Sequence, residues 1–265
     1  NKNRTNLCIE TGAQAMGVVM EGKRAVGVRY RQGGVDKVAK ARGEVLLPAG
    51  AIQSPQLLQL SGIGPAALLR QHGMPVVHDL AGVGENLQDH LQIRMIYEMK
   101  QRTTNDELNS LLGQAKLGMQ WFFKRSGPLA VGINQGGCFM KALPGEAKTP
   151  DIQFHVATLS ADMAGAKVHD FSGMTMSVCQ LRPESRGHIR IKSADPFQPP
   201  EMQPNYLSTD LDRRTNVAAL KVVRAITGSM SMRGLIKREV KPGKDTVDDA
   251  ALLEMLHSSG SPYVP

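Results

Sequence analysis

The chain has 265 residues, of which 41% are apolar, and a formal net charge of +8. This length allows one large domain or two smaller ones. No run approaches the ~18 consecutive apolar residues that a membrane-spanning helix needs, so we predict no transmembrane segment. The positive charge is spread along the chain, and aromatic residues make up only 4% of it. Proteins that bind nucleic acids concentrate basic residues on one face and add stacking rings, so the composition argues against that class.

The cysteines are Cys8, Cys138 and Cys179. An odd, scattered set without a C-x-x-C pair is typical of a reducing compartment and of buried apolar packing. It argues against a disulfide framework and against a zinc site, so we predict no metal. We therefore expect a cytoplasmic protein.

The N-terminal part of the chain reads as short strands followed by two short helices. The turn Gly33-Gly34 predicts a hairpin, and the apolar run at 44–48 is typical of a fully buried strand. Ser54 is a suitable N-cap with proline after it, and Gly62 is placed to end that helix. In chain order, the predicted elements are strands at 6–10, 25–31, 35–41 and 44–48, helices at 54–62 and 65–73, and a strand at 76–78. This order indicates an α/β arrangement.

The pattern changes after the turn-rich stretch at 82–92, which we interpret as the crossing between domains. Apolar residues from Leu108 to Phe122 recur at helical spacing and predict one long helix with an apolar face. Alternation at 152–157 predicts a strand with two different faces. Further strands are predicted at 174–181 and 188–192, and helices at 212–230 and 248–257. These elements predict a second domain of α+β class, an antiparallel sheet flanked by helices, so the domains would be 1–92 and 93–265.

The run GAIQSPQLLQLSGIG, from Gly50 to Gly64, carries the most information about function. A turn of small residues follows a predicted buried strand and opens a helix, so its backbone N–H groups can face an anion such as a pyrophosphate. Many α/β proteins have such a turn for packing reasons alone. From the residues themselves, ligand contact and packing are equally good explanations.

The spacing of the residues in this run is more informative than the capacity of its turn to face an anion. A small pair, Gly50-Ala51, precedes Ser54-Pro55, the aliphatic pair Leu57-Leu58 and the tetrapeptide Ser61-Gly62-Ile63-Gly64. This pattern resembles the signature of the glucose-methanol-choline (GMC) oxidoreductases, in particular choline dehydrogenase-like members. The flanking stretches 22–28, 72–91 and 182–208 also look like those members, so the similarity runs nearly end to end.

The resemblance implies a partial FAD-binding domain followed by a substrate domain, in a protein that passes hydride from an alcohol to FAD. It places Ala49, Gly50 and Ala51 close to the dinucleotide, Ala15 beside the adenine, and Asn86 of the GVGENLQDH stretch near the flavin. GVGENL is not itself a nucleotide-binding fingerprint, because leucine stands at the third glycine and no strand-to-helix turn precedes it. The family's fingerprint would lie upstream of Asn1.

The resemblance also identifies candidate substrate residues. His155 stands on the polar face of its predicted strand, where choline-oxidising relatives place an active-site histidine; contact with substrate and a structural role are equally good explanations. For His90, in the junction stretch, a structural role is favoured. Gln135 stands where choline-oxidising members carry glutamate, and a neutral amide loses most of the attraction for a trimethylammonium group, which argues against choline as the substrate.

No catalytic residue of the family is assigned within this chain. The family's catalytic histidine lies in a Tyr-His-Pro motif, whereas this chain ends Tyr263-Val264-Pro265. Either the motif lies beyond Pro265, or the parent protein has lost or relocated its base. The start without Met and this ending are typical of an internal fragment. We expect such a fragment to bind FAD weakly and to be inactive by itself.

The sequence therefore predicts part of an FAD-dependent alcohol dehydrogenase or oxidase. Its partners would be a small alcohol and an electron acceptor, either oxygen or a quinone, and a homo-oligomer is left open. The protein would be cytoplasmic, either free or bound at a membrane surface. The alternative is a non-catalytic fragment, or a degenerate paralogue of the same fold, that binds a ligand or partner.

Overall fold

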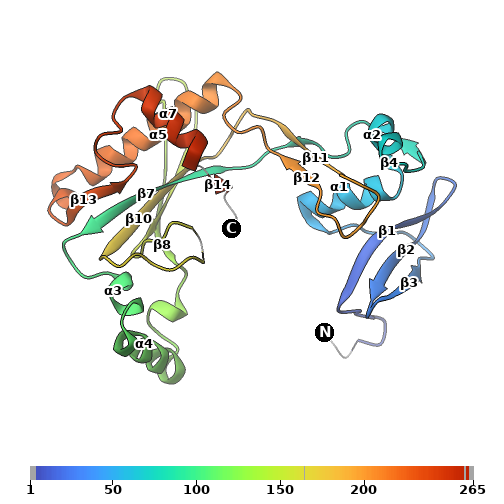
Figure 1. Cartoon of the computed structure of the whole chain (residues 1–265), viewed down its shortest axis with the longest axis horizontal. Coiled ribbons are helices and arrows are strands. Elements are labelled where there is room, and N and C mark those ends of the chain that lie inside the picture. Colours follow the sequence, from blue (N-terminus) through green and yellow to red (C-terminus); the bar gives the residue numbers. More distant parts are fainter. Residues whose placement is uncertain (1–3, 164, 260, 263–265) are drawn as a thin grey trace. The chain divides into compact units, whose positions relative to one another are not determined.

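The computed structural model describes residues 4–163, 165–259, 261 and 262, which fold as two compact units (Figure 1). Unit 1 comprises Asn1–Gln88 and Arg186–Asn205, and unit 2 comprises Asp89–Ser185 and Tyr206–Pro265. The chain first leaves unit 1 inside the turn-rich stretch that we interpreted as a crossing. The predicted division at residue 92 differs from these units, because it assigned residues 186–205 to the second domain. That segment pairs with a strand of unit 1, a long-range partner that local sequence patterns do not reveal.

Unit 1 begins with a three-stranded antiparallel sheet in the order β1-β2-β3, formed by Ala13–Glu21, Arg24–Gln32 and Val35–Lys40. The predicted hairpin is confirmed: Gln32 pairs with Val35, and Gly33 and Gly34 between them have φ values of +57° and +80°. These left-handed conformations carry little cost only for glycine, which is why this dipeptide makes the turn.

Helix α1 (Gly50–Leu60) follows the sheet and begins earlier than predicted. Ser54 was expected to cap it but lies inside it. The Ser54 hydroxyl donates to the Leu47 carbonyl at 3.0 Å and accepts from the Ala49 N–H at 3.2 Å, so it fixes the chain that leads into the helix. The predicted end is confirmed: Gly62 follows the helix with φ of +80°, and backbone of the 75–77 segment leaves no room there for a Cβ atom.

The rest of unit 1 consists of short elements around α1. Helix α2 (Ala66–Gln71) matches the second predicted helix, and β4 (Ile63–Gly64) pairs in parallel with β5 (His78–Asp79). A third sheet has the order β12-β11-β6, formed by Glu201–Gln203, Gly187–Arg190 and Glu85–Leu87. The strand predicted at 188–192 is thus present as β11, but it belongs to unit 1.

Two strands predicted in unit 1 are wrong. Residues 6–10 and 44–48 form no strand, and Leu46 in the second run is 74% exposed. Both runs have strand-like composition, but a strand also needs a neighbour that pairs with its backbone, and no described residue fills that role.

Unit 2 is built on an antiparallel sheet in the order β13-β7-β10-β9-β8, and β14 also pairs with β7. The strands are β7 (Leu91–Met99), β8 (Asn134–Met140), β9 (Ile152–Ala157), β10 (Gly173–Gln180), β13 (Ile236–Lys241) and β14 (Ser261–Pro262). The strands predicted at 152–157 and 174–181 are confirmed as β9 and β10. Every residue of β10 is buried, because it lies inside the sheet with both faces covered.

Helices α5 (Asp210–Thr227) and α7 (Asp249–Ser259) pack on one face of this sheet, and the short α6 (Met230–Arg233) follows α5 (Figure 1). They agree with the helices predicted at 212–230 and 248–257. The main core lies between these layers: Leu220 of α5 and Leu252 of α7 meet Phe154 of β9, all nearly inaccessible to solvent. Burial of such side chains contributes roughly 1.5–3 kcal/mol each.

The long helix predicted from Leu108 to Phe122 is confirmed over most of its length as α4 (Leu111–Lys124), which begins later than predicted. Leu108 instead ends the short helix α3 (Thr104–Leu108), and the 3₁₀ turn η1 (Pro128–Ala130) follows α4. The break occurs because Ser110 caps α4, its hydroxyl accepting from the Gly113 N–H at 3.4 Å. The apolar face that we recognised in the sequence is exposed to solvent. In the described part of the chain, every helix is too short or too polar to traverse a lipid bilayer.

Candidate cofactor and substrate sites

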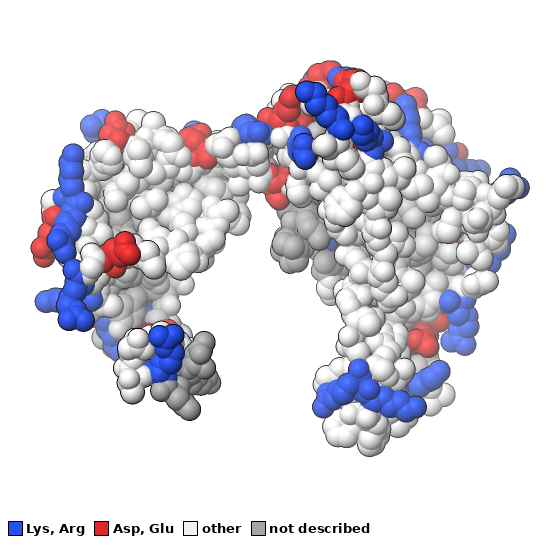
Figure 2. Space-filling view, turned by 180° about the vertical axis from the view of Figure 1, so that it is seen from behind, with Lys and Arg blue, Asp and Glu red and all other residues white. Residues whose placement is uncertain are grey.

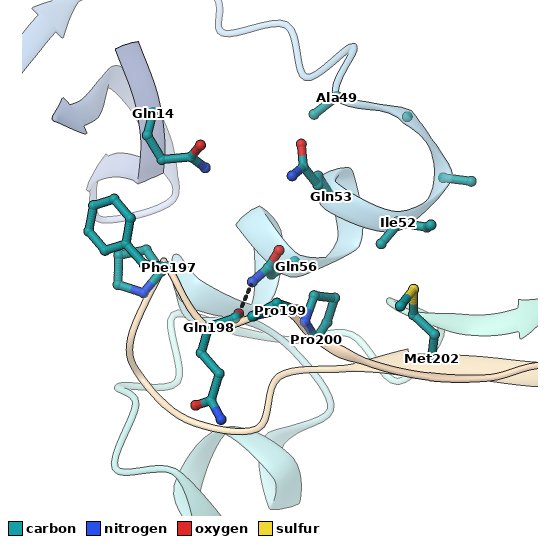
Figure 3. A pocket seen from close by; sticks show the side chains of 13 residues that line it. Gln14, Ala49, Ile52, Gln53, Gln56, Phe197, Gln198, Pro199, Pro200 and Met202 are labelled. Carbon is teal, nitrogen blue, oxygen red and sulfur yellow. Dashed lines mark hydrogen bonds between the residues drawn. The ribbon is translucent and has the colours of Figure 1, made fainter. Parts of the chain in front are cut away.

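A hollow of about 610 Å³ lies in unit 1 at the start of helix α1. Its walls come from three segments that are far apart in the sequence, as Figure 3 shows. The lining residues are Gln14 of β1, the run Ala49–Gln53 with Gln56, and Pro196–Pro200 with Met202.

The start of α1 forms one wall of this hollow. Gly50 has φ of +80°, a conformation that favours glycine, and it turns the chain sharply into the helix. No side chain caps the first turn, and no acidic residue lies in it. The positive end of the helix dipole and its N–H groups are therefore available to an anion at this wall.

The opposite wall is the loop that leads from β11 to β12. The Gln56 amide of α1 donates to the Gln198 carbonyl at 2.9 Å, which fastens the loop to the helix (Figure 3). The Phe197 N–H donates to the Asp195 carboxylate at 3.0 Å, and the guanidinium of Arg31 lies 4.8 Å from the centre of the Phe197 ring. These contacts hold an aromatic ring at the edge of the hollow.

The hollow is neutral, since no charged side chain lines it. Figure 3 shows the amides of Gln14 and Gln53 turned into the space from opposite sides. An amide both donates and accepts hydrogen bonds, which suits the edge of a heteroaromatic base, and the Phe197 ring offers a stacking face. The arrangement fits a nucleoside, with phosphate groups placed at the start of α1.

The residues that the resemblance assigned to the cofactor divide into three groups. Ala49, Gly50 and Ala51 line the hollow. Ala15 is half-buried beside the lining residue Gln14 but does not line the space itself. Asn86 is exposed in β6, has φ of +64° and is not among the lining residues.

Sequence reasoning missed most of the side chains that give the hollow its chemistry: Gln14, Gln53, Gln56, Phe197 and Met202. The available signal was the proline-rich run DPFQPP at 195–200, which lay within a stretch that we had matched to the family. Nothing local indicates that this run folds back onto α1.

The predicted substrate residue His155 lies on β9, between β8 and β10, where it faces Gly137 on one side and Ser177 on the other. The side chain is only 7% exposed, and its Nδ1 atom lies 3.4 Å from the Gln92 amide nitrogen. Because that amide nitrogen donates, Nδ1 accepts and the ring proton stays on Nε2. Burial lowers the pKa of His155, so the imidazole is neutral at pH 7.

Gln135 lies on the neighbouring edge strand β8 and is exposed. The pairing of β8 with β9 shifts between Asn134 and Gly136, so Gln135 is the extra residue of a β-bulge. Bulges re-aim side chains at sheet edges and near active sites. The structure thus brings Gln135 and His155 onto adjacent strands of one sheet, two residues out of register.

The junction residues of unit 2 have structural roles. His90 Nε2 lies 3.1 Å from the Leu181 carbonyl oxygen, the structural contact that we favoured for it. The Tyr206 hydroxyl donates to the Asp89 carboxylate, and burial together with that carboxylate raises the pKa of Tyr206. Val264 lies outside the described residues, within which no cluster of side chains suited to a metal ion is found.

Comparison with known proteins identifies the family. Two family models, both described as GMC oxidoreductase, match residues 1–92 and residues 183–261. The chain belongs to the GMC oxidoreductase family. Among curated GMC and related proteins, it is 40% identical over 259 residues to an alcohol dehydrogenase [acceptor] of Pseudomonas putida, covering 97% of this chain and 47% of that protein.

An oxygen-dependent choline dehydrogenase of Cronobacter sakazakii is also 40% identical over 259 residues, which cover 97% of this chain and 46% of that protein. This GMC chain therefore spans about half the length of the curated relatives it matches. The chain therefore aligns with only part of each of these two enzymes.

Solved structures agree on the GMC fold. A formate oxidase superposes with a TM-score of 0.91 at 22% identity over 99% of this chain and 51% of that one. A pyridoxine 4-oxidase from Mesorbium loti gives 0.81 at 24% identity over 99% and 47%. The predicted fold class, an α/β part followed by an α+β part with a helix-flanked antiparallel sheet, is confirmed.

Proposed function

We propose that this chain supplies one wall of the cofactor site of an FAD-dependent oxidoreductase, together with the sheet that carries its candidate substrate residues. The complete protein would oxidise the CH–OH group of a small alcohol. The observation that carries the proposal is the fold of the run Gly50–Gly64: its first residues line a neutral hollow, and its helix points its uncapped start at that hollow. Membership of the GMC family supports the same reading.

The residues present fit the adenosine and phosphate part of FAD. Gln14 and Gln53 would hydrogen-bond the base, Phe197 would stack on it, and the N–H groups at Gly50 and Ala51 would face the phosphates. When bound, FAD supplies the hydride acceptor that these side chains do not provide. The chain's own contribution in unit 1 is binding and orientation.

The affinity for FAD tests this assignment in the complete gene product. Replacing Phe197 with Ala removes the stacking ring, so we expect the Kd for FAD to rise about 2- to 12-fold, since aromatic pairs contribute ~0.5–1.5 kcal/mol. Phe123→Ala is the matched control, because Phe123 is an exposed phenylalanine in unit 2. An unchanged Kd for F197A, or an equal change for both variants, would refute the cofactor assignment.

The 265-residue chain by itself should bind FAD weakly. Its hollow has no charged lining residue, and the sequence contains no complete G-x-G-x-x-G turn to hold the pyrophosphate. Mixing the chain with FAD and separating free flavin by gel filtration checks this expectation. A stoichiometric yellow complex would contradict it.

On the substrate side, we propose that Gln135 selects against cationic alcohols and that His155 contacts the substrate. In the complete gene product, Gln135→Glu should lower the KM for choline about fivefold, since a carboxylate near a cation contributes ~1 kcal/mol in a solvated site. The uncharged isostere 3,3-dimethyl-1-butanol serves as the control substrate and should show no such gain. Equal effects on both substrates would show that the residue does not sense charge.

The remaining partners follow from the reaction class. We propose that a small uncharged alcohol is the donor, that oxygen or a quinone reoxidises the flavin, and that the protein works in the cytoplasm, where its free thiols stay reduced. An alcohol panel under anaerobic conditions, with flavin bleaching followed by addition of oxygen or of a soluble quinone, identifies donor and acceptor together. Absence of bleaching by any alcohol would favour the non-catalytic alternative.

A further inference from the structure

Helix α4 exposes a continuous apolar face that the fold of unit 2 does not cover. Five of its large apolar side chains are between 58% and 85% exposed, although in the sequence they look like a core-facing stripe: Leu111, Leu112, Met119, Phe122 and Phe123. Spacings of three, four and seven residues place them on one side of the helix. The opposite side is anchored by Leu117, the one buried residue of α4.

Basic residues predominate beside this face. Lys116, Lys124 and Arg125 lie in or directly after α4. One acidic residue, Glu107, lies beside Leu112 and Lys116 at the start of the helix, and no further Asp or Glu occurs from residue 108 to residue 145. Figure 2 shows Lys and Arg side chains gathered across this projecting end of unit 2, at the lower right of the view. The guanidinium of Arg125 lies 4.2 Å from the centre of the Trp121 ring, so cation and aromatic ring are held together at the end of the helix.

The apolar surface at this end of unit 2 extends beyond the face of α4 itself. Helix α4 is a convex element beyond one end of the sheet, away from α5 and α7 (Figure 1). A helix of 14 residues is about 21 Å long and ~10 Å wide, so its own face offers about 200 Å². Leu129 of η1 and Val131 after it are also more than half exposed and add apolar surface at this end of unit 2.

We propose that α4 is a membrane-surface helix that inserts its apolar face between the headgroups of an anionic lipid bilayer. The combination of an apolar face with Phe and Leu, a flanking Trp and a rim of Lys and Arg is what such helices require. The helix is too short to span a bilayer and lies in the interface plane instead. This inference does not depend on the proposed reaction, because lipid binding and FAD binding are measured separately.

Vesicle flotation of the complete gene product tests the proposal. We expect the protein to float with vesicles of phosphatidylcholine mixed with phosphatidylglycerol, much less with phosphatidylcholine alone, and less at high salt. In the 265-residue chain, Trp121 is the only tryptophan, so its emission should shift to the blue with the anionic vesicles. Failure to float with anionic vesicles overturns the proposal.

Two double variants separate the apolar and the electrostatic contributions. F122S/F123S should lower partitioning at least about tenfold on anionic vesicles. K116Q/K124Q should lower it by about 30-fold while leaving the weak binding to neutral vesicles unchanged. The matched controls V35S/V38S and K37Q/K40Q, on the exposed strand β3, should bind as the unmodified protein does.

The same variants distinguish lipid from protein occupants. Because the replaced side chains are exposed, the melting curve and the size-exclusion volume should not change. If F122S/F123S lowers the melting temperature, another part of the gene product covers this face. If it converts an oligomer to a monomer, a second copy covers it. Either result, or flotation that survives both variants, contradicts the membrane assignment.

Discussion

The most informative perturbation of stability is Asp212→Asn in the first turn of α5. The Asp212 side chain is 1% exposed and accepts hydrogen bonds from the Gln180 amide at 3.0 Å, from the N–H groups of Glu184 and Ser185 at 2.8 Å each, and from the Ser185 hydroxyl. Burial alone would raise the pKa of this carboxyl. The hydrogen bonds from Ser185, Glu184 and Gln180 outweigh that effect, so the pKa is lowered.

The expected loss in the free energy of unfolding follows from the hydrogen bonds that an asparagine amide cannot accept. Hydrogen bonds to a charged acceptor contribute about 1.5–3 kcal/mol each, against ~0.5–1.5 kcal/mol for neutral pairs. An asparagine at 212 loses the charge, and its NH₂ group faces at least one backbone N–H that then has no acceptor. We expect the free energy of unfolding of unit 2 to fall by about 2–4 kcal/mol, a large part of the ~5–15 kcal/mol typical of a domain.

Urea unfolding at pH 7, followed by the fluorescence of Trp121, measures this loss in unit 2. Asp210→Asn is the matched control on the same helix: Asp210 is 71% exposed and pairs with Arg214, and such surface pairs contribute at most ~1 kcal/mol. A loss for D212N no larger than that for D210N would refute the reasoning.

The pH dependence of the same unfolding experiment tests whether the ionised Asp212 carboxylate is what stabilises unit 2. A carboxyl whose folded pKa is lowered contributes stability that is complete above its unfolded pKa of about 3.9 and is lost as the pH falls through the lower folded value. The gap between the unmodified chain and D212N should therefore be constant from pH 7 to about pH 5 and close below about pH 4. A gap that persists in acid would show that it arises from packing and not from the carboxylate.

Two further predictions concern buried polar groups and thiols. Gln59→Leu should destabilise unit 1 by about 2–4 kcal/mol in urea unfolding monitored by circular dichroism, because it removes three hydrogen bonds, whereas Gln53→Leu at an exposed position should change stability by less than ~0.5 kcal/mol. In the native chain, a thiol reagent should modify Cys8 and Cys138 quickly and Cys179 only after unfolding, since Cys179 is buried and burial raises its pKa to about 11. Three equally fast thiols would contradict the second expectation.

The elements that could be predicted from sequence are those whose cause is local. The Gly33-Gly34 turn needs left-handed backbone at both positions, so the hairpin is specified by two residues. Gly62 ends α1 for the same reason. The alternation at 152–157 identified β9 and the side of the strand that carries His155.

The errors arose where a local pattern has two structural outcomes. The run at 44–48 has the composition of a buried strand, but composition does not supply a pairing partner. The stripe on α4 has the spacing of a core-facing helix, yet periodicity only states that one face is apolar and not what covers it. Serine before proline suggests an N-cap, but α1 already begins at Gly50, and the Ser54 hydroxyl donates to the Leu47 carbonyl instead.

The candidate site was predictable only in part, because its walls are assembled by contacts across long stretches of sequence. The family resemblance assigned Ala49, Gly50 and Ala51 to the cofactor, and these residues line the hollow. The second wall depends on residues 186–205 returning to unit 1, where Gln59 donates to the Ile189 carbonyl at 3.0 Å and accepts from the Ile191 N–H at 2.8 Å.

These contacts give the run Gly50–Gly64 a structural role that its spacing alone did not suggest. Ser61 accepts from the Val18 N–H at 2.7 Å and so joins α1 to β1, the strand that carries Gln14, while Gln59 joins the same helix to β11. The C-terminal part of the motif therefore positions β1 and the segment that begins with β11. These two segments surround the hollow together with the N-terminal end of the motif. The motif acts as the scaffold of the candidate cofactor site as well as one of its walls, which explains why polar residues lie at buried positions within an otherwise apolar helix.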